Sequence, residues 1–219
     1  MQSIFRDYRS HTLEDLRVFV KAHDVKLRVV SYKEEFGYTL DQITKRVKHI
    51  PCTPCGIFRR HLMNKYAQGY DKIATGHNLD DELQSFLMNL FKNSPALLAR
   101  QGPLVGVHPV EGLTTRIKPL MLLNEREVRI YAFIKQFQLH FSECPYAHMS
   151  FRNGVRDWLN RLEQAQPGTK EALLQSLLGM LPSLKSYYGE QKEILVKPHR
   201  AVENMLRQVI QGSADNLSS

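Results

Sequence analysis

The fold is decided by residues 71–93, which read DKIATGHNLDDELQSFLMNLFKN. The first part, residues 71–77, is short and ends in a glycine turn, and this pattern predicts a β-strand. From Asn78 onward, a good N-cap residue is followed by apolar side chains that recur every three or four positions. That spacing predicts an amphipathic helix whose buried stripe is made of Leu83, Phe86, Leu87 and Leu90.

The turn between this strand and this helix is a candidate binding site for a nucleotide. A glycine turn ahead of a helix N-terminus forms an anion-binding corner in an open α/β sheet. We expect Gly76, His77 and Asn78 to contact a cofactor there, and Asp80 or Asp81 to hold Mg²⁺ or position the nucleotide. The alternative is purely structural, because Asn78 and Asp81 have capping-box spacing and acidic residues are common in a first turn.

Further strands and helices are predicted on both sides of this unit. Before it, the pattern indicates a helix over 12–23 with Thr12 as N-cap, a strand over 26–32, a short helix or turn over 41–50 and a helix over 57–70 that stops near Gly69. After it, the pattern predicts a strand over 114–120 and a helix over 124–139 capped by Asn124. Strands that alternate with helices of this length indicate an α/β fold with a parallel sheet.

The chain changes character after Cys144, where the pattern predicts a small helical module. One helix is expected to bury Phe151, Val155, Trp158, Leu159 and Leu162, with Trp158 in the core, and the next to bury Leu174, Leu177, Leu178 and Leu181. The pattern weakens from about Ser183. We therefore expect three parts: a partial α/β domain at 1–122, a helical part of the core with the third cysteine at 123–184, and a variable tail at 185–219.

The three cysteines are the strongest candidates for a metal site. Cys52 and Cys55 have C-x-x-C spacing on an expected turn directly ahead of a helix, and Cys144 is the third. An odd number of cysteines with a C-x-x-C favours metal binding or redox chemistry over a disulfide framework. Three sulfurs would leave one position open on a cluster iron. Zinc completed by a nearby histidine (His49, His140 or His148) is the alternative.

Charge and hydropathy bear on the partners. The 219 residues carry 30 basic and 22 acidic side chains, a net charge of +8, which favours polyanions such as nucleic acid. Arg59 and Arg60 could clamp a phosphate, and Arg152 and Arg156 share a helical face that could meet a nucleic-acid backbone; in both cases a plain solvent-exposed surface is the alternative. No secretory signal and no apolar run of about 20 residues is present, so we expect a cytoplasmic protein without membrane contact.

Four motifs in this order carry a resemblance to a known family: CTPCGIFRR, TGHNLDDELQSFLMNLF, RIKPL and SECPYAHMSFRNGVRDWLN. They resemble the tRNA 2-thiouridine synthetase (TtuA/TtcA-type) branch of the PP-loop ATP pyrophosphatases, over roughly residues 37–184. The resemblance implies a PP-loop (HUP-like) domain that uses ATP and Mg²⁺. It also implies that ATP adenylates the C2 oxygen of a tRNA uridine, which sulfur then replaces.

The same resemblance implies roles for individual residues and partners. Cys52, Cys55 and Cys144 match the ligands of a [4Fe–4S] cluster. Asp80 or Asp81 matches the catalytic or ATP-site carboxylate, and Arg59 lies where the family places a basic catalytic residue, often lysine. The implied partners are tRNA, a sulfur-donor protein that is a ubiquitin-like thiocarboxylate in many relatives, and a second copy of the chain, since relatives are often dimers.

The chain also departs from this family pattern. The phosphate-binding loop S-G-G-x-D-S does not occur in the 219 residues, and no glycine precedes Gly37. We therefore expect a domain that lacks its first strands, an N-terminally truncated form whose tRNA thiolation is impaired. The alternatives are a catalytically inactive remnant that binds tRNA or a partner protein, and a zinc-stabilised scaffold.

Overall fold

A computed structural model describes residues 5–47, 49–106, 113–137, 143–188 and 198–214. The N-terminal half contains α1 (Phe5–Ala22), α2 (Tyr32–Phe36), α3 (Leu40–Arg46), α4 (Cys52–Tyr66), β1 (Lys72–Ala74), α5 (Leu79–Phe91), α6 (Pro95–Leu98) and β2 (Leu104–Val105). The C-terminal half contains β3 (Thr115–Ile117), α7 (Glu125–Ile134), the 3₁₀ turn η1 (Ala147–Met149), α8 (Phe151–Ala165), α9 (Thr169–Tyr188) and α10 (Pro198–Ala214). The chain is thus helix-rich, with a small sheet.

The sheet has three strands in the order β1-β3-β2. β1 runs parallel to β3, as expected, with Lys72 opposite Thr115. β2 runs antiparallel to β3, with Leu104 opposite Ile117, so the expectation of a wholly parallel sheet is wrong. The reason is the short connection between β2 and β3, since a parallel pairing needs a crossover of roughly a dozen residues or more.

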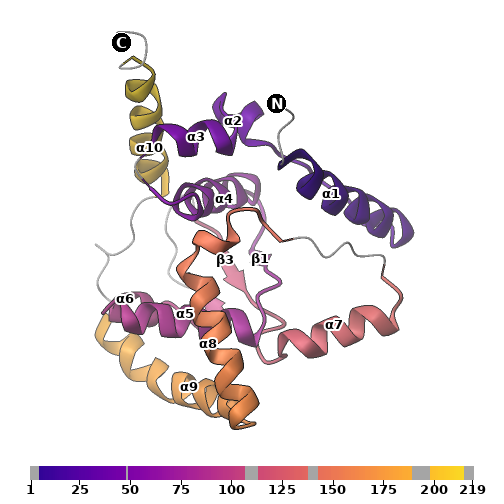
Figure 1. Cartoon of the computed structure of the whole chain (residues 1–219), viewed down its shortest axis with the longest axis vertical. Helices are drawn as coiled ribbons and strands as arrows, with labels where there is room; N and C mark the ends of the chain where they lie inside the picture. Colours follow the sequence, from indigo (N-terminus) through magenta and orange to yellow (C-terminus); the bar gives the residue numbers. More distant parts are fainter. Residues whose placement is uncertain (1–4, 48, 107–112, 138–142, 189–197, 215–219) are drawn as a thin grey trace.

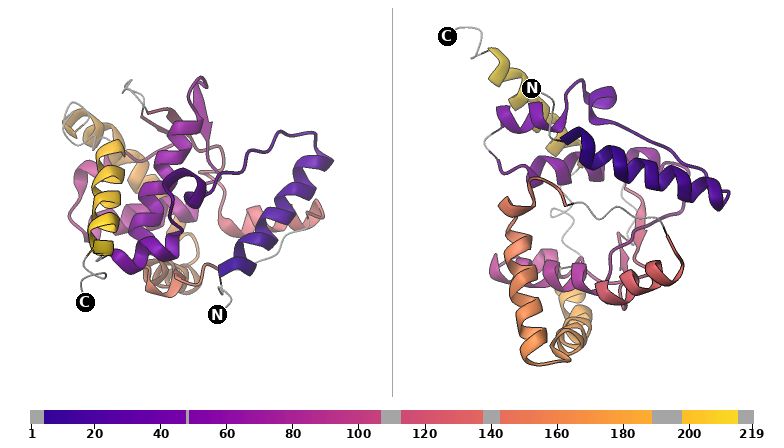
Figure 2. Two further views of the ribbon diagram at one scale, coloured as in Figure 1. Left: turned by 90° about the horizontal axis from the view of Figure 1, so that it is seen from above. Right: turned by 45° about the vertical axis from the view of Figure 1, so that its right-hand side comes forward.

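Two hydrophobic clusters lie on either side of the sheet, and Figure 1 shows β1 and β3 between the two groups of helices. The first joins α5, α6, α8 and α9 through buried side chains that include Leu83, Phe86, Leu159 and Leu177. The second joins α3, α4 and α10 through Ile43, Phe58, Val202, Met205 and Val209. The views in Figure 2 show the same division, with α8 reaching from the first group toward α4.

The strand–turn–helix unit that the sequence predicts at 71–93 is confirmed as β1 and α5. Its buried stripe is shorter than predicted, because Leu83, Phe86 and Leu87 are at most 4% exposed whereas Leu90 is 52% exposed. Asn78 caps α5, because its side chain accepts the backbone N–H of Asp81 while the Asp81 carboxylate accepts the N–H of Asn78. This capping box satisfies two N–H groups that the first turn would otherwise leave without partners. The Leu79 N–H donates to the carbonyl of Leu123, which ties the start of α5 to the chain beyond β3.

The predictions for the first 36 residues are partly wrong. Helix α1 begins at Phe5, so Thr12 lies inside the helix and does not cap it. Residues 26–31 form no strand, because no described strand pairs with them. Ser31 instead accepts the N–H of Glu34 and caps the short helix α2. β-Branched residues favour a strand only when a neighbour supplies the ladder.

The helical module after Cys144 is confirmed, but two of its expected core residues are not buried: Phe151, which is 44% exposed, and Trp158. Leu159, Leu174 and Leu177 are at most 5% exposed, whereas Trp158 is 46% exposed. Trp158 lies at the border of the apolar stripe and meets Phe91 edge-on, with ring centroids 6.1 Å apart. The prediction of Trp158 as a core residue is therefore wrong.

Helix α10 was not predicted. Its Val202, Met205 and Val209 recur at helical spacing and are buried against α3 and α4. Within the described part of the chain, no helix combines the length and the apolar character that crossing a bilayer requires.

Candidate functional site

The C-x-x-C lies inside the first turn of α4, not on a turn ahead of it as the sequence suggested. Pro51 is the N-cap and Cys52 the first helical residue. Both thiols are free; Cys52 is exposed and Cys55 half-buried. The positive end of the helix dipole favours anionic ligands at this position. The Pro51 cap makes no side-chain hydrogen bond, but the Thr53 N–H donates to the Ile50 carbonyl at 3.0 Å and the Cys55 N–H donates to the Pro51 carbonyl at 3.2 Å.

Tyr32 fixes the position of Cys55. Its hydroxyl donates to the carbonyl oxygen of Cys55 at 3.1 Å and lies 3.9 Å from the Cys55 Sγ. The Tyr32 ring packs against Phe58, with centroids 5.8 Å apart, and so belongs to the second hydrophobic cluster. The orientation of one thiol is therefore set by the core beneath it.

The turn that carries Cys144 is attached to α3, the helix that leads to the other two cysteines. The Tyr146 hydroxyl donates to Asp41 Oδ1 at 3.1 Å, and the Ala147 N–H donates to the Cys144 carbonyl at 2.8 Å. Burial, with a further contribution from Asp41, raises the pKa of Tyr146, so this phenol stays a donor. Figures 1 and 2 show the segment ahead of α8 passing beside α4.

The three thiols do not converge on one point in this structure. Across the described ranges, which include all three cysteines, no group of three or more His, Cys, Asp or Glu side chains is placed to hold a metal ion. The two described histidines considered as zinc ligands, His49 and His148, are exposed, and His140 lies outside the described residues. The donor set of three free thiols still has the chemistry of an iron–sulfur site.

The turn between β1 and α5, residues 75–78 (the β1–α5 corner), is held against β3 by a backbone hydrogen bond. The Thr75 N–H donates to the Ile117 carbonyl at 2.9 Å, and the Thr75 hydroxyl lies 2.8 Å from His77 Nδ1. Burial lowers the pKa of His77; Asp81 opposes this effect and Lys118 adds to it. A methyl group on Gly76 would meet no atom within 4 Å, so the space beside this glycine is open to a ligand.

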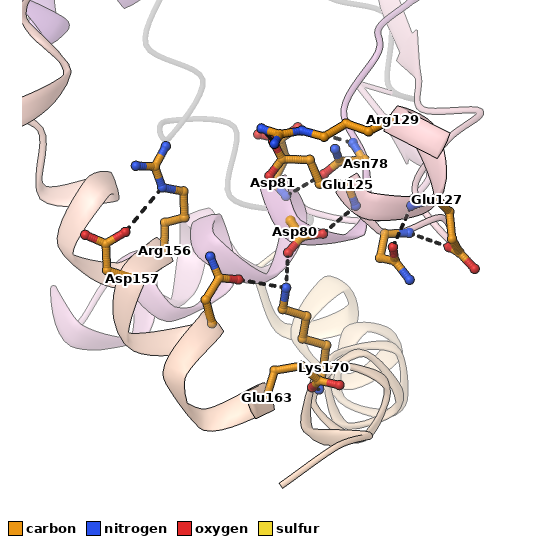
Figure 3. A network of polar contacts seen from close by, with 12 residues as sticks. Asn78, Asp80, Asp81, Glu125, Glu127, Arg129, Arg156, Asp157, Glu163 and Lys170 are labelled. Atoms are coloured by element: carbon orange, nitrogen blue, oxygen red, sulfur yellow. Dashed lines mark hydrogen bonds and ion pairs between the residues drawn. The ribbon is translucent and has the colours of Figure 1, made fainter. Parts of the chain in front are cut away.

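Asp80 is buried and has both carboxylate oxygens occupied, as Figure 3 shows. Its Oδ2 accepts the N–H of Glu125 at 2.7 Å, and its Oδ1 binds the ammonium group of Lys170. Lys170 also donates to Asn160 Oδ1 at 2.9 Å. Asp80 thus joins α5, α7, α8 and α9, an arrangement that holds the fold together around the corner.

Asp81 is more accessible than Asp80 and faces α8. Its side chain is 35% exposed, and its Oδ1 lies 3.3 Å from Nη1 of Arg152. Arg152 also donates to Gln84 and Ser85, so it connects the start of α8 to three residues of α5. The sequence indicated Arg152 for nucleic-acid contact or a solvent face; in this structure its guanidinium is bound to the protein.

Sequence reasoning missed a buried ion pair beside the corner. Lys118 Nζ lies 2.6 Å from Glu82 Oε1, and the Glu82 side chain is only 2% exposed. The signal was present, since Lys118 directly follows the strand over 115–117 that pairs with β1. Arg59 is exposed on α4, one turn beyond Cys55 on the same helical face.

Comparisons with known proteins add to this geometry. No family model matches the chain. A curated relative from Pyrococcus horikoshii, named tRNA-5-methyluridine(54) 2-sulfurtransferase, is 37% identical over 174 residues, or 78% of this chain and 54% of the relative. A protein of the same name from Thermus thermophilus is 32% identical over 87% of this chain and 59% of the relative.

A solved structure agrees with these relatives. The U34-tRNA thiolase NcsA from Methanococcus maripaludis, with its [4Fe–4S] cluster, superposes with a TM-score of 0.69 and 32% identity, covering 80% of this chain and 58% of that one. The chain spans about half the length of the curated relatives it matches. Over that span, the chain is a homologue of the tRNA 2-thiouridine synthetases of the TtuA/TtcA branch.

Proposed function

We propose that this chain takes part in the 2-thiolation of a tRNA uridine, as a tRNA sulfurtransferase that uses ATP, Mg²⁺ and a [4Fe–4S] cluster. The observation that carries the proposal is the attachment of the Cys144 turn to α3 by the Tyr146–Asp41 hydrogen bond. It ties the third thiol to the helical unit that presents the other two, although the sequence separates them widely.

Cys52, Cys55 and Cys144 are the proposed cluster ligands. All three are free thiols, and the first two lie in a helical first turn that favours anionic groups. A cluster held by three cysteines offers an open iron to a small sulfur-containing ligand. In this proposal the Cys144 turn closes onto the first turn of α4, since the three thiols do not meet in the described structure.

Asp81 and Arg59 are the proposed reacting groups of the polypeptide. Asp81 is part-exposed at the N-terminus of α5, whereas both oxygens of Asp80 are bound by Lys170 and Glu125. We therefore assign Asp80 to positioning the corner and Asp81 to the ATP or Mg²⁺ site. The Arg59 guanidinium would stabilise negative charge next to the thiols.

Gly76, His77 and Asn78 are the proposed contacts for ATP. The open space beside Gly76 lets a phosphate approach the backbone at the positive end of the α5 dipole. The N–H groups of Asn78, Leu79 and Asp81 are already bonded within the protein, so the contact is proposed at the turn and not to these groups. His77 is held in place by Thr75, and its lowered pKa keeps it neutral near pH 7, so it can donate or accept a hydrogen bond. Adenylation of the uridine C2 oxygen would make that oxygen a leaving group.

The test is anaerobic reconstitution of the full chain with iron and sulfide. We expect a brown protein that shows the visible absorption of an iron–sulfur cluster and contains about four iron atoms per chain. We expect Cys144→Ser to abolish both the absorption and the iron binding. His148→Ser is the matched control, because this exposed residue lies four positions away on the same turn and should leave iron binding unchanged. A colourless protein that retains zinc, or a Cys144→Ser variant that still binds the full amount of iron, would refute the cluster assignment.

The thiolation itself needs a separate measurement. The reconstituted protein, ATP, Mg²⁺, sulfide and unmodified tRNA are incubated together, and 2-thiouridine is quantified after nuclease digestion. Because no S-G-G-x-D-S loop occurs in the 219 residues, we expect impaired thiolation and therefore a small yield of product, which requires ATP and is lost in Asp81→Asn. If the cluster assembles but no 2-thiouridine is formed, the metal site is supported and the proposed activity is refuted.

A further inference from the structure

Three arginines from separate parts of the chain interact electrostatically beside β3. Arg60 lies on α4, Arg100 follows α6, and Arg116 is the middle residue of β3. Desolvation lowers the pKa of Arg60, and the neighbouring charges of Arg59 and then Arg100 lower it further. Desolvation likewise lowers the pKa of Arg116, with smaller contributions from Arg60 and Arg100. Desolvation also lowers the pKa of Arg100. The fold therefore holds like charges close together.

Arg60 bends back over the first turn of its own helix. A methyl group built on Gly56 would lie 3.6 Å from Nη1 and 3.7 Å from Nη2 of Arg60. The guanidinium thus lies beside Gly56, which directly follows Cys55. The Arg60 guanidinium therefore lies next to the candidate metal site.

Arg116 is held by Asn64, a residue of α4 that is 3% exposed. The Asn64 Oδ1 accepts Arg116 Nη2 and the Thr114 N–H, both at 3.3 Å, while its Nδ2 donates to the Arg60 carbonyl at 2.9 Å. Asn64 therefore links two of the arginines and fixes the plane of one guanidinium. The Arg116 Nε is buried and has no hydrogen-bond partner.

None of the described acidic side chains forms an ion pair with Arg60 or Arg116. A buried N–H donor without a partner costs free energy, and so does a group of neighbouring cations. Both costs fall when an oxyanion binds, because a guanidinium donates two parallel hydrogen bonds to a phosphate. Arg60 and Arg100 are exposed overall, so an anion has access to the group from solvent.

We propose that Arg60, Arg100 and Arg116 form a binding site for a phosphate group. The site does not depend on the proposed thiolation, since neither the thiols nor the β1–α5 corner contributes a donor to it. Its ligand is a phosphate from one of two sources, the backbone of an RNA or a free nucleotide or pyrophosphate.

The test measures anion-dependent thermal stability of the full chain in pyrophosphate and in chloride at equal ionic strength. We expect pyrophosphate to raise the Tm of the wild type by several degrees more than chloride does, and this gain to fall by at least half in Arg60→Gln and Arg116→Gln. Arg126→Gln, an exposed arginine on α7, is the matched control for lost charge and should keep the full gain. Equal gains in all four proteins overturn the proposal.

Arg60→Gln is the decisive variant, because Arg116→Gln also removes a hydrogen bond to Asn64 and can lower stability by itself. In chloride, Arg60→Gln should be at least as stable as the wild type, since it relieves repulsion. A loss of stability in chloride would mean that Arg60 is bound to the protein and would contradict the site.

A second arm separates the two sources of phosphate. The affinity for unmodified tRNA is measured by fluorescence anisotropy over a range of salt concentrations. The measured quantity is the slope of the logarithm of the binding constant against the logarithm of the salt concentration. If RNA supplies the phosphate, Arg60→Gln lowers the size of this slope by about one and Arg126→Gln does not. If a small phosphate is the ligand, the slope is unchanged while the difference in pyrophosphate stabilisation remains. Neither arm requires the cluster, so failure of the thiolation proposal can be told apart from failure here.

Discussion

The Tyr146 hydroxyl donates to Asp41 Oδ1 at 3.1 Å and joins two parts of the chain that are 105 residues apart in sequence. Tyr146 lies two residues after Cys144, and Asp41 is the second residue of α3. Since α3 packs directly on α4, this one hydrogen bond connects the third cysteine to the helix that begins with the other two. It is therefore the link on which a shared metal site would depend.

Replacing Tyr146 by Phe should lower both iron incorporation and stability. The expected loss of stability is about 1 kcal/mol, the usual net value of one hydrogen bond, measured by urea denaturation. Iron per chain should fall by at least half, because the Cys144 turn is released. Tyr66→Phe is the matched control, since it removes a tyrosine–carboxylate bond to Glu35 that lies away from Cys144. If both variants retain iron equally, the tether has no role in the site.

The ion pair of Asp80 with Lys170 should be far more important to stability than a pair on the surface. Lys170→Met leaves a carboxylate that is 6% exposed without its cation, and we expect a cost of about 3–5 kcal/mol. Arg129→Met breaks the exposed pair with Glu125 and should cost less than about 1 kcal/mol. Equal losses in denaturant midpoints would show that Asp80 is solvated in solution.

Two neighbouring residues of α8 should respond very differently to truncation. Leu159 is completely buried, so Leu159→Ala should cost about 2–5 kcal/mol. Trp158 is nearly half exposed and keeps mainly its contact with Phe91, so Trp158→Ala should cost about 1 kcal/mol or less. Thermal denaturation measures both. A larger loss at Trp158 would restore the view of this indole as a core residue.

The sequence predicted the units whose signals are local. The strand–turn–helix unit with its Asn78 cap, the capped helix α7 and the leucine stripe of α9 are all confirmed. In each case a cap and a helical repeat lie within one short stretch, and no distant residue is needed to form them. The same holds for β1 and β3, and the long connection through α5, α6 and β2 allows these two strands to pair in parallel.

What the sequence could not predict depends on distant partners. Whether residues 26–31 form a strand depends on a neighbour that the stretch itself does not encode, and the direction of β2 depends on the length of the connection that follows it. The burial of Asp80 by Lys170, 90 residues away, is of the same kind. Asp80 and Asp81 look equivalent in sequence, and only the packed structure separates them.

Acidification should reveal the environment of His77. Burial lowers the pKa of this histidine below the ordinary value of 6.5, so the unfolded chain takes up a proton first as the pH falls. Stability attributable to His77 is therefore complete above the unfolded pKa and is lost as the pH drops through 6.5 toward the folded value. The control variant is His77→Asn, which keeps a polar group for Thr75. The Tm of the wild type minus the Tm of His77→Asn should be smaller at about pH 5 than at about pH 8. A difference that does not change with pH would mean that His77 is fully solvated.

Gly76→Ala separates a structural role of this glycine from a role in ligand binding. The added methyl group would meet no protein atom within 4 Å, so the free energy of unfolding should stay within about 0.5 kcal/mol of the wild-type value. If ATP approaches the backbone at this turn, the same methyl group should weaken nucleotide binding at least tenfold, measured by calorimetry. Gly102→Ala is the contrasting control: its φ of +111° and the Leu181 Cδ1 atom at 3.2 Å predict lost stability with unchanged nucleotide affinity in the folded protein. If the nucleotide affinity of Gly76→Ala is unchanged, the nucleotide does not bind at the β1–α5 corner. The reason for assigning Asp81 to the reaction is then also lost.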